Sequence, residues 1–530
     1  MHWSMTRLTF ALGAALALSI TAADARPVKW ARGADALTLD PHSQNEGPTI
    51  AFSNQVYEAL TTRDNANKLI PALAVSWKLA DPTTWEFKLR QNVKFHNGDP
   101  FTADDVVFSY NRALQPTSDY KGYLAGVKEI VKVDDYTVQV KTTGPNPLVA
   151  DNLTSVFIMS KKWSEANNTT KVQDFKNKEE NFAVRNANGT GPFSLVSREP
   201  DVKTVLKRND AYWGRGEVPL EITELTLVPI KQDATRVAAL LSGEMDVVQD
   251  VPVQDIERLK NAPKMRVTEG PENRTIFFGF DVGSPELASS DVKGKNPFKD
   301  VRVREAVSLS LNRTAIQRVV MRGQAVPAGT IAPPFVNGYK KEFDANAGAA
   351  DVAKAKSLMA AAGYPNGFSI SLHCPNDRYL NDEAICQAAV GMMGQIGLKV
   401  NMISQSKSLH FPVLQNVKSD FYMLGWGVPT YDSDYIFSFL YHTREGTRGG
   451  WNATRYSNPE VDKLIQSLSS ETDKPKRDAT IAQIWDKLRP EHLYAAIHHQ
   501  MLAHAMKNDI EVPVRPDNII FFKQVAFKKS

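Results

Sequence analysis

Cysteine is scarce in this sequence: only Cys374 and Cys386 occur among 530 residues. Two cysteines so far apart cannot supply the Cys-x-x-Cys pair of a dithiol enzyme or of a zinc ribbon. Cys374 ends the apolar segment FSISLHC, and Cys386 lies in the expected helix DEAICQAAVGMMGQIG. A strand end and the next helix lie close enough for a disulfide, so we expect these cysteines to be bonded in an oxidising compartment. Two buried thiols are the alternative.

The motifs of common enzymes are also missing. The sequence contains no GxSxG, HExxH or GxxxxGK[ST] pattern, which are signals of hydrolases, zinc proteases and nucleotide-binding loops. This absence favours binding over catalysis, and we expect the protein not to be an enzyme. A secreted hydrolase that uses Asp432, Asp434 and a histidine is the alternative, although no paired nucleophile and base is evident.

Neither sign of charge is in large excess. The 63 Lys and Arg residues against 59 Asp and Glu give a formal net charge of +4, and no basic run occurs, so no nucleic-acid partner is expected. A hydrophobic share of 42% and a charged share of 23% are typical of soluble globular proteins. The length exceeds what one hydrophobic core supports, so two or three domains are expected.

Long hydrophobic runs are absent except at the N-terminus. Arg7 precedes the apolar stretch 8–21, and Ala23, Asp24 and Ala25 fit the small-x-small cleavage rule. We therefore expect residues 1–25 to be a cleaved signal peptide; a membrane anchor is the alternative. No cysteine stands at the cleavage site, so lipid anchoring is excluded. The expected location is the periplasm.

Local patterns predict the elements of the region around residues 85–114. Trp85, Phe87 and Leu89 alternate with polar residues, which predicts a half-buried strand. Thr102 and Asp105 have the spacing of a capping box, which predicts a helix start. His96, Asp99, Asp104 and Asp105 are therefore interpreted as scaffold rather than as a metal site. Upstream, strand and helix patterns are expected at 28–33 and 50–62, respectively.

A series of ordered motifs extends along the chain. They are PALAVSW, TWEFKLRQNVKFHNGDPFTADDVVFSYNRA, GTGPF, RNDAYW, LLSGEMDVV, NPFKDVRVREAVSLSLNR, AKSLMAAAGYPNG, IGLKV and RYSNPEVDKLI. Together they resemble the family 5 extracytoplasmic solute-binding proteins of ABC importers. The resemblance covers nearly the whole mature chain.

The resemblance implies an α/β fold of the two-lobed periplasmic binding protein type (type II, or venus-flytrap), with an extra domain inserted in the first lobe. Lobe I is expected at 26–72, 191–295 and 500–530. The inserted subdomain is expected at 73–190, and lobe II at 296–499. Strand patterns that alternate with helix patterns agree with an α/β fold.

The resemblance also implies ligand-binding residues in lobe II. Arg378 and Tyr379 occupy a strand-to-helix loop that faces the cleft, where an arginine grips a ligand carboxylate in dipeptide-binding members. A surface arginine is the alternative. Gly425 permits close backbone approach and Trp426 offers a flat apolar wall.

One position departs from the family pattern. Peptide binders carry an aspartate three residues after the tryptophan, where it holds the α-ammonium group of the ligand, and here that residue is Pro429. Asp432 or Asp434 could supply a charge from further along. From lobe I, Asn45 and Glu46 stand where oligopeptide binders carry an acidic contact residue. Their relation to the ligand is an expectation.

The histidines near the C-terminus are the strongest hint of a metal. Adjacent residues of a strand point to opposite faces, so His498 and His499 cannot readily bind one ion together. One of these histidines, or His504 nearby, could line the ligand site. We expect no dedicated metal site and no cofactor.

The function expected from the resemblance is that of a periplasmic substrate-binding protein of an ABC importer. It would be a monomer that captures a peptide or peptide-like solute between two lobes and delivers it to permease subunits at the inner membrane. An opine-like or amino-sugar conjugate, a metallophore or haem are the non-peptide alternatives. A chaperone-like holder of unfolded peptides is a further alternative.

Overall fold

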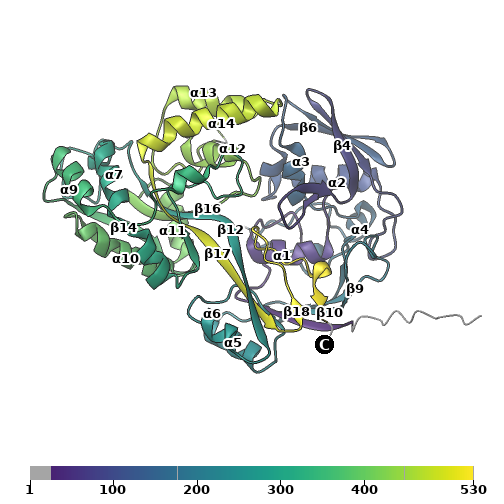
Figure 1. Ribbon diagram of the computed structural model, residues 1–530. Coiled ribbons are helices and arrows are strands. Elements are labelled where there is room, and N and C mark those ends of the chain that lie inside the picture. The colour runs from purple at the N-terminus through teal and green to yellow at the C-terminus, as the bar shows by residue number, and fades with distance from the viewer. Residues whose placement is uncertain (1–24, 176, 447, 529–530) are drawn as a thin grey trace, which may run out of the picture.

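Two lobes lie side by side and are joined by two long strands, β12 (Met265–Phe280) and β17 (Tyr494–Lys507) (Figure 1). The computed structural model describes residues 25–528 apart from 176 and 447. The predicted signal peptide therefore lies outside the described residues, except for Ala25.

The main sheet has eleven strands and runs through both lobes. Its strand order is β15-β14-β16-β12-β17-β11-β1-β10-β9-β8, and β13 pairs with β17. β12 pairs in antiparallel fashion with β16 and β17, whereas β14 with β15 and β1 with β10 are parallel pairs. The strands other than β12 and β17 have these bounds: β1 Arg26–Arg32, β8 Phe193–Glu199, β9 Lys203–Arg208, β10 Ile222–Pro229, β11 Val247–Val248, β13 Ala325–Pro327, β14 Ser369–Pro375, β15 Lys399–Gln405 and β16 Phe421–Gly427.

The first lobe, on the right in Figure 1, also contains a separate four-stranded antiparallel sheet in the order β4-β5-β7-β6. Its strands are β4 (Ala74–Asp81), β5 (Thr84–Leu89), β6 (Val127–Asp134) and β7 (Thr137–Thr142). Helix α2 (Ala103–Ala113) packs on this sheet through a core that includes Phe87, Val106 and Tyr110.

The local predictions for this region are confirmed. β5 begins one residue before Trp85, and Phe87 and Leu89 are buried. The backbone N–H of Thr102 donates to Oδ2 of Asp105 at 2.9 Å, which is the capping box at the start of α2. Asp105 serves the helix start as well as the neighbouring backbone N–H of Lys161, at 2.9 Å.

The helix expected over 50–62 is shorter and begins earlier, because α1 spans Gly47–Val56. The carbonyl of Val56 accepts a hydrogen bond from the N–H of Gly191 at 2.9 Å. The last carbonyl of the helix is therefore satisfied by a residue far away in sequence instead of by a further helical turn. A Cβ on Gly191 would lie 2.6 Å from that carbonyl oxygen, so only glycine permits this approach. The chain then forms β2 (Thr61–Arg63), which pairs with β3 (Leu69–Pro71).

The second lobe, on the left in Figure 1, is built on β14, β15 and β16. Its longer helices are α7 (Val301–Ser310), α9 (Val352–Ala361), α10 (Asp382–Gly394), α13 (Pro459–Leu468) and α14 (Lys474–Leu488). Within the described part of the chain, no helix combines the length and apolar character needed to cross a membrane.

Candidate functional site

Several residues expected at the site gather where β14 and β16 end. Arg378 and Tyr379 follow β14, and Gly425 and Trp426 lie near the C-terminal end of β16. Arg274 of β12 pairs with Gly427 of β16 and so joins the same group. Ligands of α/β folds bind at the carboxyl ends of strands, which makes this the candidate site.

Arg378 carries a positive charge without a protein partner. Among the residues that the structure describes, none makes a hydrogen bond or an ion pair with its guanidinium, which stacks 4.9 Å from the ring centre of Tyr379. Burial, and secondly the charge of Arg274, lower the pKa of Arg378, but an arginine remains charged at neutral pH. Its donors are therefore available to an anion.

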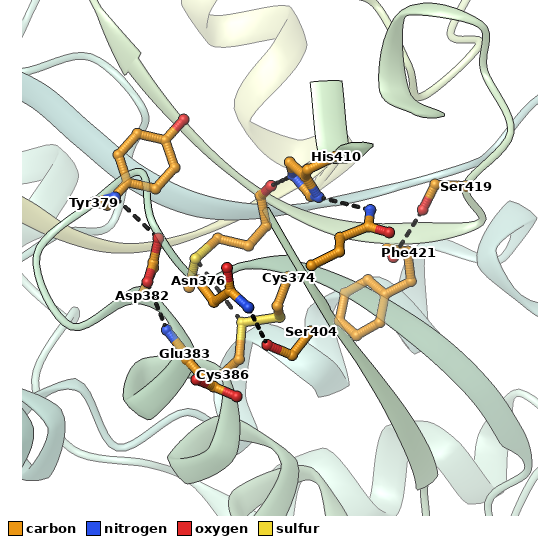
Figure 2. Close-up of a disulfide and its surroundings, with 12 residues drawn as sticks. Cys374, Asn376, Tyr379, Asp382, Glu383, Cys386, Ser404, His410, Ser419 and Phe421 are labelled. Carbon is orange, nitrogen blue, oxygen red and sulfur yellow. Dashed lines mark hydrogen bonds between the residues drawn. A yellow bond between two sulfur atoms is a disulfide. The ribbon is translucent and has the colours of Figure 1, made fainter. Parts of the chain in front are cut away.

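The backbone around Arg378 is held in place. The N–H groups of Arg378 and Tyr379 both donate to Oδ2 of Asp382 at 2.9 Å, and Figure 2 shows Tyr379 and Asp382 in this arrangement. Asp382 is the first residue of α10. The loop that carries the free guanidinium is thereby tied to the helix that follows it.

A second guanidinium adds to the positive charge. The Nε of Arg274 donates to Oε1 of Glu272 at 2.9 Å, and the other oxygen of Glu272 accepts a bond from Gln500. Burial is the largest influence on the pKa of Arg274 and lowers it, but the charge and hydrogen bond of Glu272, together with Tyr379 and Tyr435, outweigh burial, so the pKa is raised. Arg274 is paired with Glu272, whereas the guanidinium of Arg378 has no hydrogen-bonded carboxylate among the described residues, which suits a monoanionic group.

Tyr379 and Gly425 fit each other closely. The hydroxyl of Tyr379 donates to the carbonyl of Gly425 at 3.1 Å. A Cβ on Gly425 would lie 2.5 Å from Cδ1 of Ile276 and 2.6 Å from Cε1 of Tyr379. The close approach expected at Gly425 is thus made by the ring of Tyr379. Contact of either residue with a ligand stays a prediction.

Trp426 is the centre of an aromatic group. Its ring lies 5.7 Å from Tyr435, 5.9 Å from Phe439 and 5.8 Å from Trp451, between ring centres. Its buried Nε1 has no hydrogen-bond partner among the described residues. The sequence interpretation missed Tyr435 and Phe439, although their spacing of four residues, in α12 (Ser433–Ile436) and the helical turn after it, places them on one face.

The first lobe contributes Asn45 and Tyr123. The Nδ2 of Asn45 donates to the hydroxyl of Tyr123 at 3.3 Å, and Asn45 is exposed. Burial raises the pKa of Tyr435 in the second lobe, and ionisation of Tyr123 would raise it further. Tyr123 was not singled out from the sequence. Only the tertiary structure brings it to this place.

Glu46 has a structural role. It is the N-cap of α1, where its Oε1 accepts bonds from the N–H of Thr49 at 2.7 Å and from the hydroxyl of Thr49. One carboxylate oxygen is therefore committed to the helix start. The contact of Asn45 and Glu46 with a ligand stays a prediction, with Asn45 the more accessible of the two.

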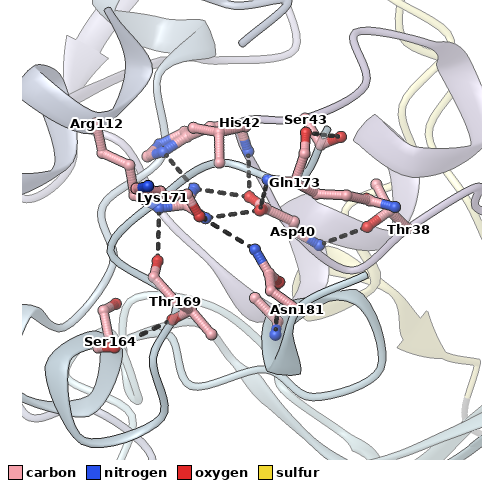
Figure 3. Close-up of polar contacts among 12 residues, drawn as sticks. Thr38, Asp40, His42, Ser43, Arg112, Ser164, Thr169, Lys171, Gln173 and Asn181 are labelled. Carbon is pink, nitrogen blue, oxygen red and sulfur yellow. Dashed lines mark hydrogen bonds and ion pairs between the residues drawn. The ribbon is translucent and has the colours of Figure 1, made fainter. Parts of the chain in front are cut away.

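The segment that leads to Asn45 and Glu46 is anchored by a buried network (Figure 3). Arg112 binds Asp40 and also donates to the carbonyls of Thr169 and Lys171, each at 2.9 Å. Burial would raise the pKa of Asp40, but the charge and hydrogen bonds of Arg112 lower it to about 2. The network fixes the segment before α1 against α2.

The acids after Trp426 are mostly committed to the protein. Oδ1 of Asp432 lies 2.5 Å from Nη2 of Arg477, and Asp432 also accepts the N–H of Asp434 at 2.9 Å as the N-cap of α12. Asp432 therefore has little capacity left for a ligand. Asp434 accepts the hydroxyl of Ser438 at 3.2 Å, and burial raises its pKa to about 6.

The histidines of β17 do not converge. His498 pairs with Ile276 and His499 with Thr275, neighbouring positions of β12 whose side chains alternate between faces. His499 bonds to Oγ1 of Thr275 at 2.8 Å and to Oδ2 of Asp344 at 3.0 Å. Burial lowers the pKa of His498 to about 3. Within the described residues, no group of three or more His, Cys, Asp or Glu side chains could hold a metal ion.

Cys374 and Cys386 are joined by a disulfide in the structure, with their Cα atoms 6.6 Å apart (Figure 2). The bond links the end of β14 to α10. It thus encloses the loop that carries Arg378 and Tyr379. The disulfide and the bonds to Asp382 together restrict the position of this loop.

Known proteins resemble this chain over most of its length. A family model described as bacterial extracellular solute-binding proteins, family 5 Middle, matches residues 68–448. The Heme-binding protein A of Haemophilus influenzae is 28% identical over 469 residues, covering 83% of this chain and 80% of that protein. The Dipeptide-binding protein of Escherichia coli K12 is 28% identical over 476 residues, covering 82% and 84%.

The fold is also found among solved structures. A dipeptide binding protein from Pseudoalteromonas sp. SM9913, in complex with Met-Leu, has a TM-score of 0.77 at 23% identity and covers 95% of this chain and 100% of that chain. This likeness confirms the predicted two-lobed α/β fold. The exact lobe boundaries stay a prediction.

Proposed function

Because the chain belongs to family 5 of the bacterial extracellular solute-binding proteins, we propose that it captures a small peptide or peptide-like solute with an anionic group between its lobes. It is a solute-binding protein of an ABC transporter, and its family is not one of enzymes. A secreted hydrolase is therefore the wrong interpretation.

The observation that carries the proposal is the free guanidinium of Arg378. A charged group that is half-buried without a partner is costly, and an anionic ligand group removes this cost by accepting its hydrogen bonds. A solute that contacts both lobes only in the closed state shifts the equilibrium towards closure. The aromatic group around Trp426 would pack against the body of the same solute.

The peptide-like class has support from the relatives, since one is named for dipeptides and one solved structure holds Met-Leu. Pro429 and the occupied carboxylate of Asp432 argue that a free α-amino group is not required. Opine-like conjugates, a metallophore and haem remain the non-peptide alternatives, and one relative is named for haem.

The same comparison supports a proposal for the cellular role. We propose that residues 1–25 direct export and that the mature protein works as a monomer in the periplasm. There it would deliver its solute to permease subunits at the inner membrane. The anion site and the two-lobed fold are consistent with this role.

Titration calorimetry with alanyl-phenylalanine and with its C-terminal amide tests the anion site. The wild type should bind the free acid more tightly, and Arg378→Ala should lose about 2–5 kcal/mol for the acid alone, as when one partner of a buried charge pair is removed. The control is Arg318→Ala, which removes an exposed arginine of the same lobe. Equal binding of both probes by all three proteins would refute the anion site.

A further inference from the structure

One arginine of the first lobe contacts the second lobe directly. Arg63 ends β2, and its Nη2 lies 2.6 Å from Oδ1 of Asp151 in α3 (Val149–Asn152), also in the first lobe. The same Nη2 donates to the backbone carbonyl of Thr430 at 3.3 Å, and the guanidinium stacks 4.7 Å from the ring centre of Tyr431. Thr430 and Tyr431 connect β16 to α12 in the second lobe.

Contacts within the first lobe already hold the side chain of Arg63 in the position that the contact with the second lobe requires. The side chain is 9% exposed, and Nη1 donates to the carbonyl of Asn67 at 3.0 Å. Arg515 in turn donates to the carbonyl of Arg63 at 3.2 Å and to Oδ1 of Asn65 at 3.1 Å. Little side-chain freedom is left to lose when the contact with the second lobe forms.

The receiving segment is held both by a residue of β12 and by a residue of the second lobe. Nδ2 of Asn273 donates to the carbonyl of Val428 at 2.6 Å, and Asp432 is bound by Arg477. Tyr431 has a φ of +56°, a backbone conformation that a bulky residue rarely adopts without a structural reason. The conformation presents the Thr430 carbonyl and the Tyr431 ring to the same guanidinium.

We propose that Arg63 is a positioning residue that latches the two lobes together, through Thr430 and Tyr431, and favours the closed state even before a solute is bound. The inference rests on the proposed function only in that closure is the step by which a solute is captured. Opening the lobes separates the guanidinium from a carbonyl and an aromatic face, while its bonds to Asp151 and Asn67 persist.

Substitutions in the latch and in the anion site should therefore have different effects on solute binding. Arg63 holds protein groups, so its loss should weaken the closed state by the same factor for every solute. Arg378 has a free guanidinium, so its loss should act only on anionic solutes. A hydrogen bond and a cation–π contact at a largely desolvated place should together change the ratio of closed to open molecules about tenfold.

Distances between two spin labels, measured by double electron–electron resonance in the absence of any solute, test the latch. The labels are placed at Val133→Cys, an exposed position of β6, and at Lys476→Cys, an exposed position of α14, in the full mature chain. The wild-type background should show a closed population, and Arg63→Ala should reduce its ratio to the open population about tenfold.

The matched control is Arg90→Ala. Arg90 also stacks on an aromatic ring, that of Trp213 at 4.1 Å, and donates to the carbonyl of Ala72 at 3.1 Å, but all its contacts lie within the first lobe. This variant should keep the wild-type distances. Arg63→Ala and Tyr431→Leu combined should lose less than the sum of their separate losses, because they remove one shared contact.

The latch is refuted if the wild-type background has no closed population, if Arg63→Ala leaves the populations unchanged, or if Arg90→Ala changes them equally. Additive losses for the Arg63 and Tyr431 variants would likewise contradict it. Because no solute is present, a failure of the dipeptide probes to bind would count against the proposed function and leave this result unaffected.

Discussion

Arg112 donates two parallel hydrogen bonds to Asp40, from Nη1 to Oδ1 at 2.7 Å and from Nη2 to Oδ2 at 2.6 Å (Figure 3). Both side chains are fully buried. The pair joins α2 to the segment that leads into α1 and carries Asn45 and Glu46. Removing one partner of a buried pair leaves the other charge without compensation, which costs more than the pair itself contributes.

Arg112→Ala should therefore lower the free energy of unfolding by about 3–5 kcal/mol in urea titrations at neutral pH. The control is Arg302→Ala, which breaks an equally short pair with Asp300 at 2.6 Å on the surface and should cost far less, because water screens an exposed pair. Equal losses for the two variants would show that burial of the pair is not what matters.

The buried imidazole of His498 should make stability depend on pH. Its folded-state pKa of about 3 lies below the value near 6.5 of an unfolded chain, so between these values only the unfolded chain binds this proton. The contribution is complete above about pH 6.5 and is lost as the pH falls towards 3, on the order of 4 kcal/mol in total.

His498→Leu should reduce the pH dependence of the unfolding free energy by about one proton between pH 4 and 6, measured by urea titration at several pH values. Other buried histidines with a lowered pKa, such as His42 and His410, remain in the variant and supply the residual slope. An unchanged slope would mean that His498 is not buried in its neutral form.

The disulfide should be present in exported protein, and peptide mapping without reductant should find Cys374 linked to Cys386. Closing a loop with a sequence separation of 12 contributes about 3 kcal/mol on the chain-entropy model, so Cys374→Ser with Cys386→Ser should lose up to that amount. The double variant should also bind alanyl-phenylalanine more weakly, since the loop of Arg378 becomes freer. Two free thiols in the exported wild type would refute the bond.

Gly425→Ala should destabilise the protein by about 1–3 kcal/mol, because the new Cβ would overlap Ile276 and Tyr379. The matched control is Gly391→Ala in α10, where a Cβ meets nothing within 4 Å. Alanine is a better helix former than glycine, so the control should be neutral or stabilising by up to about 1 kcal/mol. Thermal unfolding of both variants tests this prediction. Equal melting temperatures for the two variants would contradict the close packing of Gly425 against Ile276 and Tyr379.

Pro429→Asp should create a preference for solutes with a free α-amino group. The new carboxylate would stand at the position where the family resemblance predicts the aspartate of peptide binders, although removing proline also returns backbone freedom to the loop. The affinity ratio of alanyl-phenylalanine to its N-acetylated form should be near one in the wild type and larger in the variant. Strong discrimination already in the wild type would show that another acid, with Asp434 the less committed candidate, binds the amino group.

The sequence by itself determined the features that depend on near neighbours. The alternation of Trp85, Phe87 and Leu89 predicts β5, and the spacing of Thr102 and Asp105 predicts the start of α2, because each involves partners a few residues apart. The ordered motifs indicated the family and with it the two-lobed fold, which the comparisons confirm.

Only the tertiary structure decided which polar groups are free. Arg378 and Arg477 both have mostly polar neighbours in sequence, and no local pattern distinguishes them. Among the described residues, the guanidinium of Arg378 has no hydrogen-bond partner, whereas that of Arg477 binds Asp432. The end of α1 depends in the same way on Gly191, and the contact of Arg63 depends on Thr430. In each case the deciding hydrogen bond joins segments far apart in the chain, so the role of the side chain or carbonyl is set by packing rather than by its own neighbours.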